Sequence, residues 1–99
     1  MIRGTTPTLE FTLPFDTDIL AEAWVTMAQN GEVVLDKHFS ECQRDKNVLT
    51  VKLTQEETLA LKCNCLVEIQ VRVRTKEGEA LASEPMLESP DRILKDGVI

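Results

Sequence analysis

Hydrophobic and polar residues alternate strictly along three segments of this chain, and the alternation predicts β-strands. In TLEFTL, residues 8 to 13, every second residue is apolar, and VLTVKL, residues 48 to 53, and LVEIQVRVRT, residues 66 to 75, follow the same rule. A strand buried on one face has this period of two, because successive side chains point to opposite faces of the sheet. We therefore expect one set of apolar side chains to face a core, namely Leu9, Phe11, Leu13, Leu49, Val51, Leu53, Val67, Ile69, Val71 and Val73.

Asn30-Gly31 is the strongest hairpin signal, and it lies between two further strand-like segments, residues 21–29 and 32–39. Both turn residues tolerate the positive φ that a two-residue type I′ turn requires. The same alternation fixes the expected facing of the returning segment: Val33, Leu35 and Phe39 point inward, and His38 points outward.

A second hairpin is predicted at residues 76–78, which end on Gly78 at the position where a left-handed residue is needed. Residues 79–87 are the expected partner strand. Pro85 places the end of that strand at an edge or a bulge, because proline cannot donate to a ladder. The polar segment 43–47 is typical of a turn.

One short helix is expected at about residues 54–61. Thr54 is a suitable N-cap, and Glu57 three residues later completes a capping box. The acidic first turn also suits the positive end of the helix dipole. Because isolated helices of two turns are marginal, we expect this one to be a crossover packed on the sheet.

Six or seven short strands with one helical turn are typical of an all-β fold, an antiparallel Ig-like β-sandwich. A length of 99 residues fits a single β-sandwich domain that covers residues 1–99. The first strand, residues 8–13, and the last, residues 79–88, are the candidate sheet edges. Exposed edges offer unpaired backbone groups to a partner.

Composition and charge narrow the function classes. Seventeen acidic residues against eleven basic ones give a net charge of -6, which disfavours nucleic acid and a membrane surface as partners. No apolar run approaches the roughly 18 residues of a membrane helix. The N-terminus has no apolar stretch behind its positive charge, so we expect no secretory signal and a reducing cytosol. The three cysteines are then expected to be free thiols.

The only potential metal ligands of the zinc type are His38, Cys42, Cys63 and Cys65. Structural zinc sites usually separate paired cysteines by two to four residues, whereas Cys63-Asn64-Cys65 separates them by one. The redox spacing C-x-x-C is also missing. We therefore expect no metal or cofactor, with Cys63 in a loop and Cys65 packed in the core as a small hydrophobe. A small metal-binding or regulatory domain that uses these four residues is the alternative.

Catalytic candidates are few. His38 is the only histidine, and no motif places a nucleophile or a carboxylate beside it, so we expect no enzyme and assign no catalytic residue. Arg72 and Arg74 form a small basic stripe that we interpret as a solvated strand face. Trp24 lies opposite the apolar set of its strand, and an exposed tryptophan often marks an interface. The alternative, which the pattern slightly favours, is that this opposite face is buried and Trp24 belongs to the core.

Four segments resemble a family of small proteins encoded in prophages and phage-like elements of Gram-positive bacteria. They are FTLPFD near the start, LTQEETLAL, VEIQVRVRTKEGEALAS, and ILKDGVI near the end. The resemblance implies a structural or tail-associated β-domain, similar to the N-terminal β-sandwich of phage baseplate upper proteins. It implies no catalytic residues, and CNC departs from the family pattern.

On this resemblance the expected function is a non-enzymatic structural or assembly module of a phage tail, a baseplate or a phage-like particle. Its expected partners are copies of itself and other phage structural proteins, with no nucleic acid and no membrane. The expected location is the host cytoplasm during assembly, and then the virion.

Overall fold

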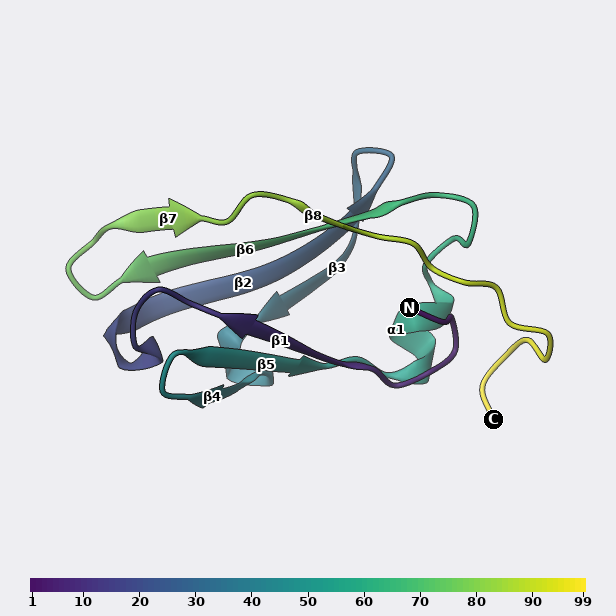
Figure 1. Cartoon of the computed structure of the whole chain (residues 1–99), viewed down its shortest axis with the longest axis horizontal. Coiled ribbons are helices and arrows are strands. Elements are labelled where there is room, and N and C mark those ends of the chain that lie inside the picture. Colours follow the sequence, from purple (N-terminus) through teal and green to yellow (C-terminus); the bar gives the residue numbers. More distant parts are fainter.

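Eight strands form two antiparallel sheets in the computed structural model, which describes residues 1–99 (Figure 1). The three-stranded sheet has the order β1 (Thr8–Thr12), β5 (Val48–Lys52) and β4 (Gln43–Asp45). The five-stranded sheet has the order β3 (Glu32–His38), β2 (Leu20–Gln29) and β6 (Val67–Thr75), and then β7 (Ala80–Ala82) and β8 (Met86–Glu88), which both pair with β6. The helices are α1 (Gln55–Leu59) and the 3-10 turns η1 (Thr17–Ile19) and η2 (Phe39–Glu41). The predicted all-β sandwich with one short helix is confirmed.

The core lies between the two sheets and is a single cluster of 13 buried hydrophobic residues. The inward positions of β5 and β6 are buried as the alternation predicted, and Leu9 and Phe11 of β1 pack against them half-buried. Each fully buried aliphatic side chain contributes about 1.5–3 kcal/mol. Alternation along β1, β5 and β6 therefore predicted most of the core correctly.

The expected facing of β3 is wrong at Val33. Met27 of β2 pairs with Leu35, and the next residue, Ala28, pairs with Val33, so Val34 is an extra residue in the ladder. This bulge reverses the inward–outward alternation between Leu35 and Val33, so Val33 faces outward and is 62% exposed. Leu35 and Phe39 still pack against the core as expected.

Turn residues predicted one connection correctly and one incorrectly. Asn30 and Gly31 have φ values of 51° and 78°, as a type I′ hairpin requires. The segment 43–47, predicted as a turn, instead begins with β4, because residues 43–45 pair with β5. The turn itself is confined to Lys46 and Asn47, and Lys46 has a positive φ of 53°.

The predicted strand 79–87 is divided into β7 and β8, which is why the structure has more strands than expected. Between them, the Ser83 hydroxyl accepts from the Val71 N–H at 3.0 Å, and the Ser83 N–H donates to the Val71 carbonyl. Pro85 follows and cannot donate to the ladder. Both pieces lie at the edge of their sheet, as does β1, so the predicted edges are confirmed.

The helix α1 begins at the predicted cap. The Thr54 hydroxyl accepts from the Glu57 N–H, and the Glu57 carboxylate accepts from the Thr54 N–H. The helix ends at Leu59, two residues earlier than predicted, and Leu61 beyond it is buried in the core. No helix of the chain is long and apolar enough to span a bilayer.

Candidate functional site

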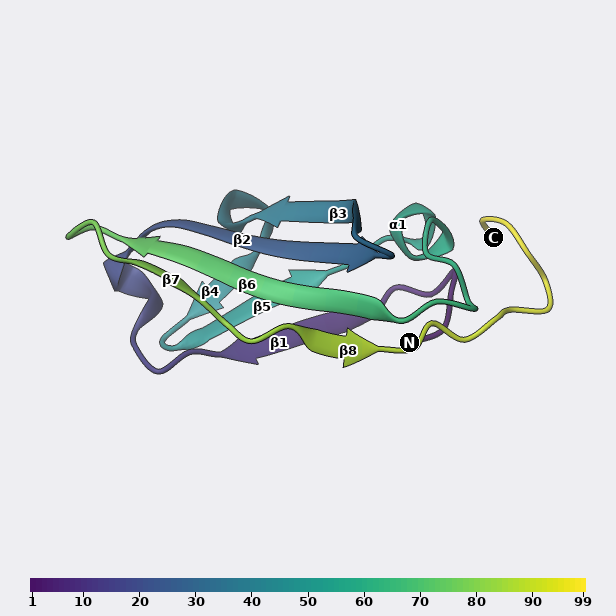
Figure 2. The same cartoon turned by 90° about the horizontal axis from the view of Figure 1, so that it is seen from above.

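The face of the five-stranded sheet that points away from the three-stranded sheet, called the outer face below, presents Trp24 near its middle. Strand register places Trp24 between His38 of β3 and Arg72 of β6. Ala23, Val25 and Met27 of the same strand point into the core, so Trp24 faces out, and it is 39% exposed. Figure 2 shows β3, β2 and β6 side by side, with β5 passing behind β6. The alternative that the Trp24 face is the buried one is wrong.

His38 is held from both sides of its ring. Its Nδ1 accepts from the Ser40 N–H at 3.2 Å, so the proton of the neutral imidazole lies on Nε2. Nε2 then donates to Glu22 at 2.9 Å. The ring also makes an edge contact with Trp24, with centroids 4.8 Å apart. The Trp24 side chain therefore rests against an imidazole whose orientation is fixed.

Glu22, His38 and Ser40 form the acid–imidazole–hydroxyl sequence of a nucleophilic triad, with the Ser40 hydroxyl 2.8 Å from Nδ1. No sequence motif indicates this grouping, because Glu22 comes from another strand. The geometry, however, is that of a cap: His38 precedes η2, and the Ser40 N–H already uses the Nδ1 lone pair. A triad also needs donors aimed at an oxyanion beside the hydroxyl. The nearest backbone N–H groups cap the turn, since Ser40 N–H donates to His38 and Cys42 N–H to the Phe39 carbonyl.

Arg72 and Arg74 lie on the outer face beside Trp24 and Glu22, and both are exposed. Neither guanidinium forms an ion pair within the chain, although Glu22 is directly opposite Arg74, because the Glu22 carboxylate pairs with His38. A shallow depression of about 210 Å³ lies between Trp24 and the two arginines. This part of an acidic protein therefore offers two free cations next to an exposed indole.

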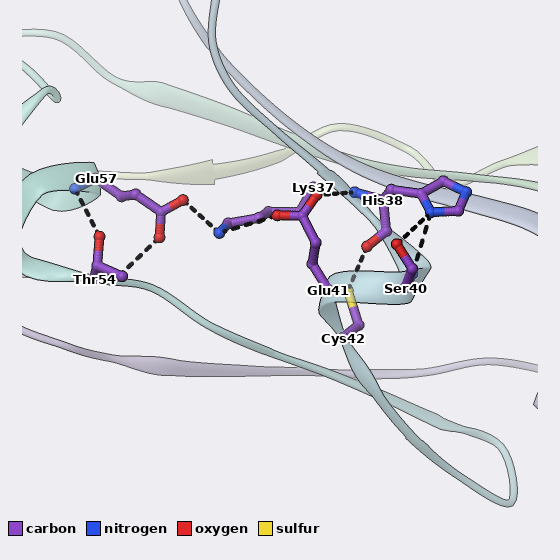
Figure 3. Close-up of polar contacts among 7 residues, drawn as sticks. All are labelled: Lys37, His38, Ser40, Glu41, Cys42, Thr54 and Glu57. Atoms are coloured by element: carbon purple, nitrogen blue, oxygen red, sulfur yellow. Dashed lines mark hydrogen bonds and ion pairs between the residues drawn. The ribbon is translucent and has the colours of Figure 1, made fainter.

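A second polar cluster lies on the other side of β3 and joins it to α1 (Figure 3). The bulge turns Lys37 inward, and its Nζ lies 2.5 Å from Glu57 and 3.5 Å from Glu41. The hydrogen bond that the Lys37 ammonium donates to Glu57 raises the pKa of Lys37 above its ordinary value, although burial opposes this. Burial alone would raise the pKa of Glu57, but hydrogen bonds from Lys37 and Thr54 lower it below its ordinary value. The Lys37–Glu57 ion pair of this cluster therefore links α1 to β3.

The four candidate metal ligands do not converge. The Cys42 thiol donates to the His38 carbonyl at 3.4 Å, at η2, whereas Cys63 and Cys65 lie in the turn between α1 and β6 near Asn30. No group of three or more histidine, cysteine or acidic side chains in the chain is placed to hold a metal ion. All three cysteines are free, and burial raises the pKa of Cys42, so its thiol stays protonated.

Cys65 differs from the prediction. It is half-buried rather than a core residue, and its Sγ accepts from the Asn30 side-chain amide at 3.4 Å. Cys63 is exposed in the loop, as predicted. The Lys62–Cys65 turn is instead anchored by Gln29, whose buried amide donates to the Lys62 and Cys65 carbonyls at 2.8 and 3.1 Å and accepts from the Lys62 N–H at 2.9 Å. Sequence reasoning missed Gln29, because a glutamine at the end of a strand carries no signal of burial.

Comparisons with known proteins add no family. The chain matches no protein-family model, and no curated protein or solved structure is significantly similar to it.

Proposed function

We propose that this chain is a non-enzymatic assembly module of a phage tail or phage-like particle, and that it works through protein–protein contacts on its outer face. The observation that carries the proposal is the exposed Trp24 flanked by Arg72 and His38 on an uncovered sheet. The phage setting is supported by the sequence resemblance, from which we expect the host cytoplasm during assembly and then the particle.

The residue types on the outer face are those that dominate protein interfaces. Tryptophan and arginine are the most enriched residues at interface positions that lose 2 kcal/mol or more on truncation to alanine. Trp24 also keeps a fixed orientation, since His38 supports it and is itself held by Glu22 and Ser40. Little conformational entropy is lost when such a side chain is buried by a partner.

Binding to the products of neighbouring genes tests the proposal. Each candidate partner is purified, and its affinity for the chain is measured by calorimetry with the native sequence and with Trp24→Ala. We expect the substitution to weaken binding by about 30-fold, equivalent to about 2 kcal/mol. Ile19→Ala is the matched control, because Ile19 is 42% exposed and lies outside the outer face.

Two results would overturn the proposal. One is that no neighbouring gene product binds, or that Trp24→Ala and Ile19→Ala bind equally well. The other is hydrolysis of an activated ester that disappears in Ser40→Ala, because that result would assign the Glu22–His38–Ser40 sequence to catalysis rather than to capping.

A further inference from the structure

The charges of the outer face are separated along the strands. The outward residues of β6 are, in order, Glu68, Gln70, Arg72 and Arg74, so the strand is acidic at one end and basic at the other. None of these charged side chains forms an ion pair within the chain. The face therefore carries an unneutralised charge gradient.

Neighbouring strands extend the same gradient. Strand register places Gln70, Thr26 and Asp36 in one row across the sheet, and Arg72, Trp24 and His38 in the next row. Asp36 is exposed and thus adds to the acidic side. At the other end, the Glu22 carboxylate beside Arg74 is paired with the His38 imidazole, so Arg72 and Arg74 are the unpaired charges there. The rest of the face is mainly apolar, with alanines at 28, 80 and 82 and the exposed side chains of Val33 and Leu87.

We infer that the outer face binds a second copy of this chain, face to face, about a two-fold axis that lies in the interface and runs perpendicular to the strands. The inference rests on the proposed function and names a partner for the same surface. Such an axis places β6 over β6 and β2 over β2 of the second copy, with opposite strand directions. It is the isologous arrangement of a closed dimer.

This orientation pairs opposite charges. With the axis between the row of Arg72 and the row of Gln70, Arg74 of each copy lies over Glu68 of the other. Arg72 then faces the Gln70 amide, Trp24 faces Thr26, and the His38 imidazole faces Asp36. A two-fold axis parallel to the strands and along β6 would instead stack Arg74 on Arg74, and like charges in contact oppose association. A parallel axis between β2 and β6 would place Arg74 over Glu22, whose carboxylate is already paired with His38.

The size of the face predicts a weak dimer. Four strands spaced about 4.8 Å apart, over about seven residues at 3.3 Å each, give a face of about 440 Å² per copy. Stable interfaces bury about 800 Å² per partner. We therefore expect a dissociation constant on the order of 100 µM, set by Trp24 and the charge pairs more than by area.

Charge exchange tests the orientation. The native chain, Glu68→Arg and Arg74→Glu are studied by sedimentation equilibrium up to about 1 mM protein at about 0.05 M salt, where screening is weak. We expect each single variant to weaken self-association at least about tenfold, and the equimolar mixture of the two variants to restore it. Lys52→Glu is the matched control, because Lys52 is an exposed residue of the other sheet and forms no ion pair.

Trp24 supplies a second readout, since it is the only tryptophan of the chain. Its emission should shift to shorter wavelength as the native chain associates and should not shift in Arg74→Glu at the same concentration. Thermal unfolding of each variant confirms that it is folded.

The outcomes separate this inference from the proposed function. A native chain that stays monomeric at about 1 mM overturns the inference. It does not overturn the proposed function, which is tested separately by the binding of another gene product to the Trp24 surface at micromolar concentration. Self-association that the charge variants weaken no more than Lys52→Glu, or that their mixture fails to restore, also overturns it, because a different surface then holds the copies together.

Discussion

Replacement of Gln29 by leucine should destabilise the fold more than its position at the end of a strand suggests. The Gln29 side chain is of similar size to leucine and is only 5% exposed, so the substitution leaves the volume nearly unchanged. It removes three hydrogen bonds to the Lys62–Cys65 turn, two donated to carbonyls and one accepted from the Lys62 N–H. The turn would lose its only side-chain link to the β2–β3 hairpin other than the Asn30–Cys65 contact.

The expected loss follows from the three backbone groups left behind. A buried polar group without a partner costs about 1–3 kcal/mol. Water can reach the exposed side of this turn and replace part of the loss, so we expect a total of about 2–4 kcal/mol. A domain of this size has about 5–15 kcal/mol of stability and loses about 4–8 °C in Tm per kcal/mol. Gln29→Leu should therefore lower Tm by about 10–25 °C.

Urea unfolding followed by circular dichroism measures the effect. Gln43→Leu is the control, because Gln43 is exposed on β4 and its side chain makes no hydrogen bond within the chain, so we expect a change within about 0.5 kcal/mol. Gln29→Glu should also be destabilising, because it sets a carboxylate against two carbonyl oxygens. A Gln29→Leu protein as stable as Gln43→Leu would refute the role assigned to this amide.

Three other perturbations probe the helix, the ion pair and the hairpin. Thr58→Val should cost about 2–4 kcal/mol in urea unfolding, because it removes a fully buried hydroxyl that accepts from the Gly4 N–H and donates to the Thr5 carbonyl. Thr50→Val should cost little, because Thr50 is only half-buried and its hydroxyl makes no hydrogen bond within the chain. The Lys37–Glu57 pair should stabilise the fold at neutral pH, with a coupling of about 1–2 kcal/mol in a double-mutant cycle with Lys37→Met and Glu57→Gln. The pKa of Glu57 is lowered in the folded protein, so the stability that Glu57 contributes is present above about pH 4.3 and is lost as the pH falls through the lowered folded-state pKa. The pKa of Lys37 is raised, so the stability that Lys37 contributes is lost only as the pH rises above about 10.4. A coupling that is unchanged at pH 2 would contradict this assignment. Gly31→Ala should lower the free energy of unfolding by about 1 kcal/mol, because Gly31 has a φ of 78° in the β2–β3 hairpin. Gly97→Ala should lower it by less, because Gly97 lies in a turn outside the two sheets.

Periodicity predicted the parts of the fold in which one face of a strand is buried along its whole length. Val67 to Val73 in β6 are the clearest case, because every second side chain is buried. The same reasoning was wrong at Val33, since a bulge is one inserted residue that no local pattern announces. It also missed β4, a strand of three exposed residues that is defined only by pairing with β5.

The candidate site was predicted in the same uneven way. Alternation placed Arg72 and Arg74 on the solvent face of their strand, because a strand has a fixed period, but it left open whether Trp24 faces outward or into the core. The pairing of Glu22 with His38 depends on the register between β2 and β3, which is set by the hairpin and its bulge rather than by either segment alone. The contact between Lys37 and Glu57 also could not be predicted from one segment, because it depends on the register that the bulge sets between β2 and β3.

The buried core and the proposed association surface lie on opposite sides of β2, so stability and binding are separable by mutation. The inward residues Ala23, Val25 and Met27 are at most 1% exposed, and Gln29 and Thr58 fix the turns at the same end of the sandwich. The outward charges of β6, Glu68, Arg72 and Arg74, make no ion pair within the chain, so their replacement removes no native partner. Surface substitutions of this kind usually change stability by less than about 0.5 kcal/mol. A loss of binding in Arg74→Glu or Glu68→Arg therefore reports on the outer face, whereas the same loss in Gln29→Leu reports on unfolding.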